Sequence, residues 1–270
     1  MNMKRTVLVL SALGLLGTGL AVQAMPHHDA SGVPACCDAG ADPVGHMGHM
    51  GHMGHAMGGM SGMNPHAMMM SGMSEADLAK LTPMQQELMQ GMNQMHGAMH
   101  DGMTHKNPDA AFSAGMIPHH QGAIAMAEVQ LKYGKDPEMR KLAQAIIDAQ
   151  GPEIARMNDW IIKHPNAMKE KAKSHADMLP MHQELFAGMT AMHDGMMKGM
   201  MQADADVAFA AGMIPHHQGA VDMAKAELKY GKDADMKKLA EEIIAAQGPE
   251  IEQMSKWLEA RGIDPAQFMW

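Results

Sequence analysis

Apolar residues follow a helical period through the chain after residue 74, in three long segments that then recur. The segments span about 75–104, 108–133 and 136–163, and in each of them apolar positions return every three or four residues. That spacing is typical of helices that bury one face. Runs of β-branched residues with a period of two do not occur, so a sheet is not expected. The pattern predicts an all-α protein made of helical bundles.

Signals for helix starts support these boundaries. Thr82-Pro83, Asn107-Pro108 and Asp136-Pro137 each combine a capping side chain with a proline suited to the first helical turn. Inside the third segment, Pro152 follows Gly151. Because proline removes a helical hydrogen bond, we expect a kink or a restart of the helix there.

The second half of the helical region is a copy of the first. Residues 112–161 align with residues 209–258 without gaps, and 33 of the 50 positions are identical. Both copies contain Gly-Met-Ile-Pro-His-His-Gln-Gly-Ala and, further on, Ala-Gln-Gly-Pro-Glu-Ile. We therefore expect helical repeat 1 over residues 74–166 and helical repeat 2 over residues 167–270. Two separate bundles and one merged bundle both satisfy this pattern.

The beginning of the chain has the features of an export signal. Lys4 and Arg5 precede an apolar stretch at 7–22, and Ala24 ends a group of small residues suited to cleavage. We expect residues 1–24 to be a signal peptide that directs the protein to the periplasm. No later stretch reaches about 18 consecutive apolar residues, so no membrane span is expected in the mature chain.

Residues 25–73 form an arm that is rich in Met, His and Gly and has no Lys or Arg. Glycine at every third position weakens both helix and strand, so we expect the arm to be disordered without metal. Short His-rich tracts are typical of metal binding, whereas an inert linker needs neither Met nor His. The metal-binding residues expected in the arm are His46, Met47, His49, Met50, His52, Met53 and His55.

The amino-acid composition limits which side chains could bind a metal. The chain has 37 Met, 18 His and a net charge of −9, and this acidic balance argues against binding to nucleic acid. Its 2 cysteines, Cys36 and Cys37, provide neither a disulfide framework nor a zinc scaffold. They could join a metal site, form bridges between molecules or do neither, and we assign them no central role. The candidate metal ligands are therefore thioethers and imidazoles.

Met and His share helix faces in both copies. A stripe of methionines usually forms core, because Met fills irregular gaps. Here the stripe includes histidine, which a plain core avoids, and the arm repeats the same residue types where no core exists. We predict one metal-binding face in each copy: Met92, Met95, His96, Met99, His100, Met103, Met116, His119, His120 and Met126, and Met189, Met192, His193, Met196, Met200, Met213, His216, His217 and Met223.

The type of ligand indicates the metal. Thioether sulfur is soft and selects Cu(I) and, by the same chemistry, silver, whereas imidazole also binds Cu(II). Thioethers carry no ionisable proton and cannot form disulfides, which suits a protein outside the cytoplasm. Carboxylate clusters spaced for calcium or magnesium do not occur in the sequence. The expected cargo is copper in both oxidation states, with silver as its analogue.

Catalysis is not expected. Di-iron oxidases need Glu-x-x-His on two helices and blue-copper sites need a cysteine ligand, and neither copy has either feature. Two other hypotheses remain open, a helical module whose Met-rich face binds a partner protein and a copper oxidase. The first predicts association without metal, and the second predicts oxygen-dependent turnover of Cu(I).

The repeated Gly-Met-Ile-Pro-His-His-Gln-Gly-Ala motif, with the Gln…Glu-Ile…Met…Trp pattern after it, resembles the domain-of-unknown-function family 305. The resemblance implies a ferritin-like four-helix bundle and a relation to periplasmic copper-binding and copper-resistance proteins of the CopM type. It implies as motif residues Met116, His119, His120, Met126, Met213, His216, His217 and Met223. We expect an exported protein that sequesters or buffers Cu(I) and Cu(II), with copper-transfer proteins as further partners.

Overall fold

The computed structural model describes residues 80–270, and nearly all of this part of the chain is helical. The helices are α3 (Pro83–Met103), α4 (Pro108–Tyr133), α5 (Pro137–Lys163), α6 (Pro180–Met200), α7 (Ala205–Tyr230) and α8 (Ala234–Glu259). Short 3₁₀ helices at His175–Asp177 and Pro265–Phe268 precede α6 and follow α8. The predicted all-α fold is confirmed. The expected signal peptide and the expected metal-binding arm lie outside the described residues.

Capping side chains begin the helices where the sequence predicts them. The Thr82 hydroxyl accepts a hydrogen bond from the amide of Gln85, and the Asn107 side chain accepts one from the amide of Ala110. The Asp136 carboxylate caps α5 in the same way. These bonds satisfy amides that have no partner within the first helical turn. The predicted starts of these three helices therefore agree closely with the structure.

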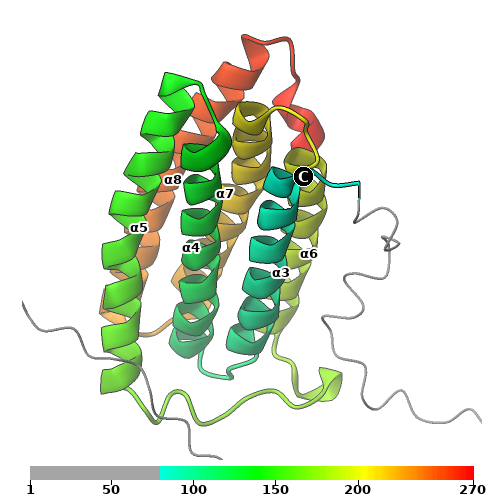
Figure 1. Cartoon of the computed structure of the whole chain (residues 1–270). Coiled ribbons are helices and arrows are strands. Elements are labelled where there is room, and N and C mark those ends of the chain that lie inside the picture. Colours follow the sequence, from blue (N-terminus) through cyan, green and yellow to red (C-terminus); the bar gives the residue numbers. More distant parts are fainter. Residues whose placement is uncertain (1–79) are drawn as a thin grey trace, which may run out of the picture. The chain divides into compact units, whose positions relative to one another are not determined.

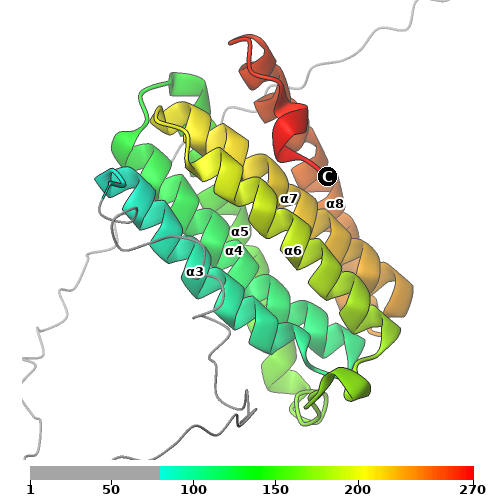
Figure 2. The same ribbon diagram turned by 90° about the vertical axis from the view of Figure 1, so that its right-hand side faces the viewer.

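The six helices form one bundle rather than two. α4 packs against α7, α3 lies on α4, and α6 lies on α7. α5 packs on α4 and α8 packs on α7, so α5 and α8 lie at one edge of the bundle and α3 and α6 lie at the opposite edge (Figure 1). α3 and α6 also contact each other and run in opposite directions (Figure 2). The two copies are joined face to face, which answers the question that the repeat pattern leaves open.

Prolines inside the helices do not end them. α4 continues through Pro118 and α5 continues through Pro152, so the restart considered for Pro152 does not occur. The turns on both sides stay helical although one hydrogen bond is lost. Pro118 leaves the carbonyl of Ala114 without its helical partner, and Gly102 of α3 packs on that carbonyl. A Cβ at Gly102 would lie 2.2 Å from the Ala114 oxygen, so the close crossing of α3 and α4 requires glycine.

Two buried carboxylates tie each copy to the other. Asp109, at the start of α4, accepts hydrogen bonds at 2.8 Å from the amides of Lys232 and Asp233 in the α7–α8 turn. Asp206, at the start of α7, accepts the equivalent bonds from the α4–α5 turn. Each copy therefore orders a turn of the other, and the contact is reciprocal.

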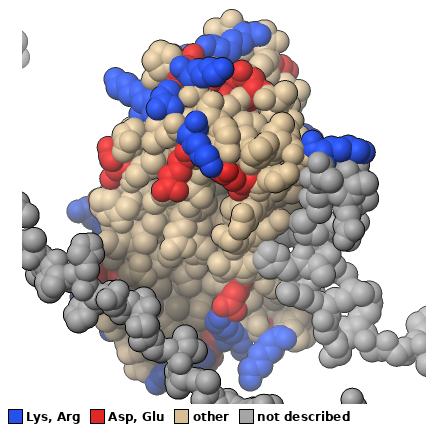
Figure 3. Space-filling view, in the orientation of Figure 1, with Lys and Arg blue, Asp and Glu red and all other residues tan. Residues whose placement is uncertain are grey.

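The surface carries mixed charge around a core that is rich in methionine. On the face shown in Figure 3, Lys and Arg are interspersed with Asp and Glu, so this face offers no extended basic surface. Within residues 80–270, no helix is both long enough and apolar enough to cross a membrane.

Candidate metal centre

Four imidazoles lie in the interior of the bundle. His119 and His120 are on α4, His216 and His217 are the equivalent residues on α7, and all four side chains are fully buried. Because α4 packs against α7, the two pairs meet, and the ring centroids of His119 and His216 are 3.8 Å apart. Burying imidazoles costs free energy unless their nitrogen atoms find partners. The partner of each nitrogen therefore matters for the chemistry of the site.

His119 and His216 bond to each other's backbone. The His119 Nε2 donates to the carbonyl of His216 at 3.0 Å, and the His216 Nε2 donates to the carbonyl of His119 at 3.1 Å. A carbonyl can only accept, so each ring carries a hydrogen on Nε2. Burial first, and then neighbouring imidazoles, lower the pKa of both rings well below the usual range. Both rings are neutral at pH 7, and the Nδ1 of each is a bare lone pair.

Glutamates orient the other two rings. The His120 Nε2 donates to the Glu153 carboxylate at 2.7 Å, and the His217 Nε2 donates to the Glu250 carboxylate at 2.6 Å. A carboxylate behind an imidazole is the usual means by which proteins orient a metal-binding histidine. The Nδ1 atoms of all four histidines are buried and have no hydrogen-bond partner within residues 80–270. The four rings are thus anchored at one nitrogen and free at the other.

The metal-binding residues predicted from the sequence do not include Glu153 or Glu250. A signal for them exists, because Ala-Gln-Gly-Pro-Glu-Ile is identical in both copies and its glutamate follows the second histidine by 33 residues in each. The periodicity of a single helix does not reveal that α5 packs on α4 and carries this carboxylate to the ring.

The expected sulfur donors of the helical region are methionines on α3, α4, α6 and α7. Two of them reach from one copy to the other. The Met223 methyl group packs on Gly115, where a Cβ would lie 3.0 Å from it, and the Met126 methyl group packs on Gly212, where a Cβ would lie 3.1 Å from it. Among the predicted histidines of the helical region, His100 is only partly buried, as is His193, and it packs on Phe186. The buried methionines of the predicted set are Met92, Met95, Met99, Met103, Met116, Met126, Met189, Met192, Met196, Met200, Met213 and Met223.

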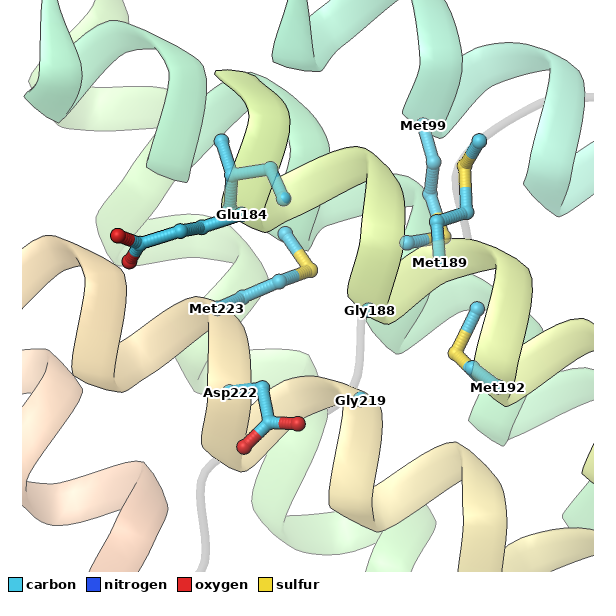
Figure 4. A pocket seen from close by; sticks show the side chains of 9 residues that line it. Met99, Glu184, Gly188, Met189, Met192, Gly219, Asp222 and Met223 are labelled. Atoms are coloured by element: carbon cyan, nitrogen blue, oxygen red, sulfur yellow. The ribbon is translucent and has the colours of Figure 1, made fainter. Parts of the chain in front are cut away.

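Four thioethers line a small cavity between α3, α6 and α7 (Figure 4). Met99 comes from the first copy, and Met189, Met192 and Met223 come from the second. The cavity has a volume of about 10 Å³, which is close to the space that one water-sized atom needs. Sulfur atoms from both copies therefore border a space of atomic size.

A second pair of equivalent histidines meets where α3 contacts α6. His96 is fully buried, His193 is partly buried, and their Nδ1 atoms are 3.1 Å apart. Burial lowers the pKa of His96 to about 3 and also lowers the pKa of His193. Both rings are therefore neutral at pH 7. The sequence places these two residues on separate faces, one in each copy, whereas the structure brings them together.

The donor types limit the metals that this region could hold. Within residues 80–270, no three His, Cys, Asp or Glu side chains converge on a point where they could bind one metal ion. Structural zinc sites and calcium sites are built from three or more such ligands. A site with three or more protein ligands in this region therefore needs thioether sulfur beside imidazole.

Several known proteins are similar to this chain. CopM in the Cu(I)-bound form is 32% identical, with 56% of this chain and 96% of CopM covered and a TM-score of 0.43. CopM in the Ag-bound form obtained by soaking is 33% identical, with coverage of 56% and 95% and a TM-score of 0.42. A DUF305 protein from Streptomyces coelicolor is 26% identical, with coverage of 59% and 95% and a TM-score of 0.46.

An uncharacterized protein of Acanthamoeba polyphaga mimivirus is 44% identical over 50 residues. This match covers 18% of the present chain and only 33% of the viral protein. The model of the domain of unknown function DUF305 matches residues 109–258, which is more than half of the chain. The protein therefore belongs to the DUF305 family.

Proposed function

We propose that the helical region binds copper, and Cu(I) above all, through imidazole and thioether donors in its core. The observation that carries the proposal is the set of four buried histidines whose Nε2 atoms are all hydrogen-bonded and whose Nδ1 atoms are all free. An unsatisfied buried polar group costs about 1–3 kcal/mol. Four such nitrogens therefore lower the stability of the free protein, and a function that uses them would explain why they are present. Metal binding is the function that their chemistry favours.

Soft sulfur favours Cu(I) over other biological cations. Thioethers select Cu(I) and Ag(I), and imidazole serves Cu(I) and Cu(II) alike. His119 and His216 are neutral at pH 7, so no proton has to leave Nδ1 before a metal binds there. Proton competition therefore weakens such a site less than it weakens a cysteine site.

CopM, to which the chain is similar, is known in Cu(I)-bound, Cu(II)-bound and Ag-bound forms. The present chain has its own buried donors for these metals. Its histidines and methionines provide both the soft and the intermediate ligands that Cu(I) and Cu(II) prefer.

The proposed biological role is sequestration or buffering of copper outside the cytoplasm, in copper resistance or homeostasis. Residues 1–24 would direct export, and the arm at 25–73 would capture ions through its Met and His side chains. Tethering the arm to the bundle raises the effective concentration of captured ions near the core. Both segments precede the described residues, so this part of the proposal rests on the sequence.

Competition with a chromogenic Cu(I) chelator tests the proposal on the full chain. We expect the wild type to retain at least one Cu(I) per chain, and the double variant His119→Phe/His216→Phe to retain at least one fewer. Phenylalanine keeps much of the ring volume, and circular dichroism checks that the variant stays helical. His175→Ala changes an exposed histidine and serves as the control.

Two results would overturn the proposal. One is a wild-type stoichiometry below one Cu(I) per chain, and the other is an equal Cu(I) count in the wild type and in the folded double variant. If the double variant loses its helices, Glu153→Gln with Glu250→Gln replaces it, because that variant removes only the carboxylates behind His120 and His217. Unchanged affinity in this second variant would also contradict the proposal.

A further inference from the structure

Equivalent residues of the two copies meet on a common axis. His119 meets His216 and His96 meets His193, and the members of each pair are 97 residues apart. The reciprocal bonds of the first pair, at 3.0 and 3.1 Å, show that the relation is close to a two-fold rotation. A donor on such an axis faces its own counterpart. A ligand bound there therefore contacts both copies.

The contact between His96 and His193 joins their Nδ1 atoms and leaves one buried nitrogen without a hydrogen-bond partner. Their Nδ1 atoms face each other at 3.1 Å, and only one hydrogen fits between them, so one ring donates and the other accepts. The Nε2 of His96 is buried and has no partner in the described part of the chain. The two Nδ1 atoms are close enough for one ion to bind both.

Thioethers lie one helical turn away from this pair on both helices. Met99 follows His96 by three residues on α3, and Met189 precedes His193 by four residues on α6, so each shares a helix face with its histidine. Since α3 and α6 run in opposite directions, the two methionines lie on the same side of the histidine pair. Both line the cavity of Figure 4.

We infer that His96 and His193 form one shared site for a soft monovalent cation, Cu(I) or Ag(I), completed by the thioethers of Met99 and Met189. The inference rests on the proposed copper-binding function, and it replaces two independent sites on α3 and α6 with one site between the copies. His193 is partly exposed, so an ion reaches the pair without opening the core.

Binding of the cation to this pair needs no oxidant or reductant. Two metal–nitrogen bonds of about 2 Å span a 3.1 Å separation with a bent angle at the metal, which leaves positions for sulfur ligands. The ring that carried hydrogen on Nδ1 carries it on Nε2 instead. Each ring stays neutral, no electron is transferred, and the site gains the single charge of the cation.

Titration with Ag(I), which is not subject to redox changes in air, tests the inference by counting bound ions. The full-length variants are His96→Gln, His193→Gln and the double variant, and all keep the same arm. One shared site predicts that each single variant loses one Ag(I) per chain and that the double variant loses no more than either single variant. His175→Gln, at an exposed position, should lose none.

Two outcomes would overturn the inference. A double variant that loses two ions while each single variant loses one would show two separate sites, and single variants that lose none would show that the pair is only structural. Should His96→Gln fail to fold, Met99→Leu with Met189→Leu provides the same count with core volume largely conserved. A failure of the proposed copper-binding function can be told apart from a failure of this shared site. In the first case His119→Phe/His216→Phe would not change the Ag(I) count either.

Discussion

At the scale of single residues, one pair of equivalent positions shows how surroundings decide chemistry. Gln130 on α4 donates to the Asp206 carboxylate at 2.6 Å. Its equivalent on α7 is Glu227, whose buried carboxyl group lies beside the Asp109 carboxylate. A carboxyl group can donate to a carboxylate only while it is protonated. Burial first, and then the neighbouring Asp109 carboxylate, raise the pKa of Glu227 to about 9, so this side chain imitates glutamine at pH 7.

We expect Glu227→Gln to increase the free energy of unfolding at pH 7–9. In the unfolded chain the carboxyl loses its proton near pH 4.5, whereas in the folded protein it keeps the proton up to about pH 9. Between these values the folded state holds one more proton, so stability falls as pH rises, by at most about 1.4 kcal/mol per pH unit. Urea unfolding at several pH values measures this slope, which the variant should lack.

The first copy provides the matched control for this prediction. Gln130→Glu places a carboxyl group opposite Asp206, so it should introduce a second loss of stability over the same pH range. If Glu227→Gln has the same pH dependence of unfolding as the wild type, Glu227 is not protonated in the folded state and this account of the pair is wrong.

The glutamates behind the motif histidines support a second prediction at this scale. Glu153→Gln with Glu250→Gln should weaken Cu(I) binding by roughly 10–100-fold while the helices stay intact, because amides no longer strengthen and orient the imidazoles as carboxylates do. Chelator competition measures the affinity. Glu87→Gln, which removes an exposed partner of Lys132, is the control and should leave the affinity unchanged.

At the scale of helices, capping residues predict more than periodicity does. Asn107-Pro108 and Asp136-Pro137 predict the starts of α4 and α5, because a side-chain cap and a proline are local signals. The local sequence does not predict that α5 continues through Pro152, because this depends on how the helical turns before and after the proline pack on the rest of the bundle. The close crossing at Gly102 is also not predictable, because it depends on a carbonyl of another helix.

Two helical glycines should respond to alanine in opposite ways. Gly102→Ala should destabilise the protein by about 1–3 kcal/mol, because its Cβ would overlap the Ala114 carbonyl. Gly91→Ala should stabilise it by about 0.5–1 kcal/mol, because its Cβ would meet only the Ala125 Cβ at an ordinary 3.7 Å and alanine favours the helix. Thermal unfolding of both variants tests the pair, and equal effects would contradict the described crossing of α3 and α4.

At the scale of the molecule, the sequence predicts the donors but not their grouping. Met and His on shared helix faces indicate soft-metal chemistry, and the repeat indicates two equivalent halves. Helical period alone leaves open which faces meet. The joining of α4 to α7 and of α3 to α6 unites His119 with His216 and His96 with His193, so donors that appear separate along the chain become pairs.

A fragment of residues 74–166 should not persist as a folded monomer. Alone it would expose the face of α4 that packs against α7, including the buried Met116 and His119. Because the copies are related by a near two-fold axis, the fragment should instead form a dimer of itself. Analytical ultracentrifugation with circular dichroism tests this expectation, and a helical monomer with cooperative unfolding would contradict it.

We propose above all that the buried thioethers and imidazoles act together as a coordination sphere. Anomalous diffraction from crystals of the full chain soaked in a silver salt tests it most directly. We expect strong peaks inside the bundle, between His96 and His193 and among the methionines of α3, α6 and α7. Well-ordered bundles without any internal anomalous peak would contradict it.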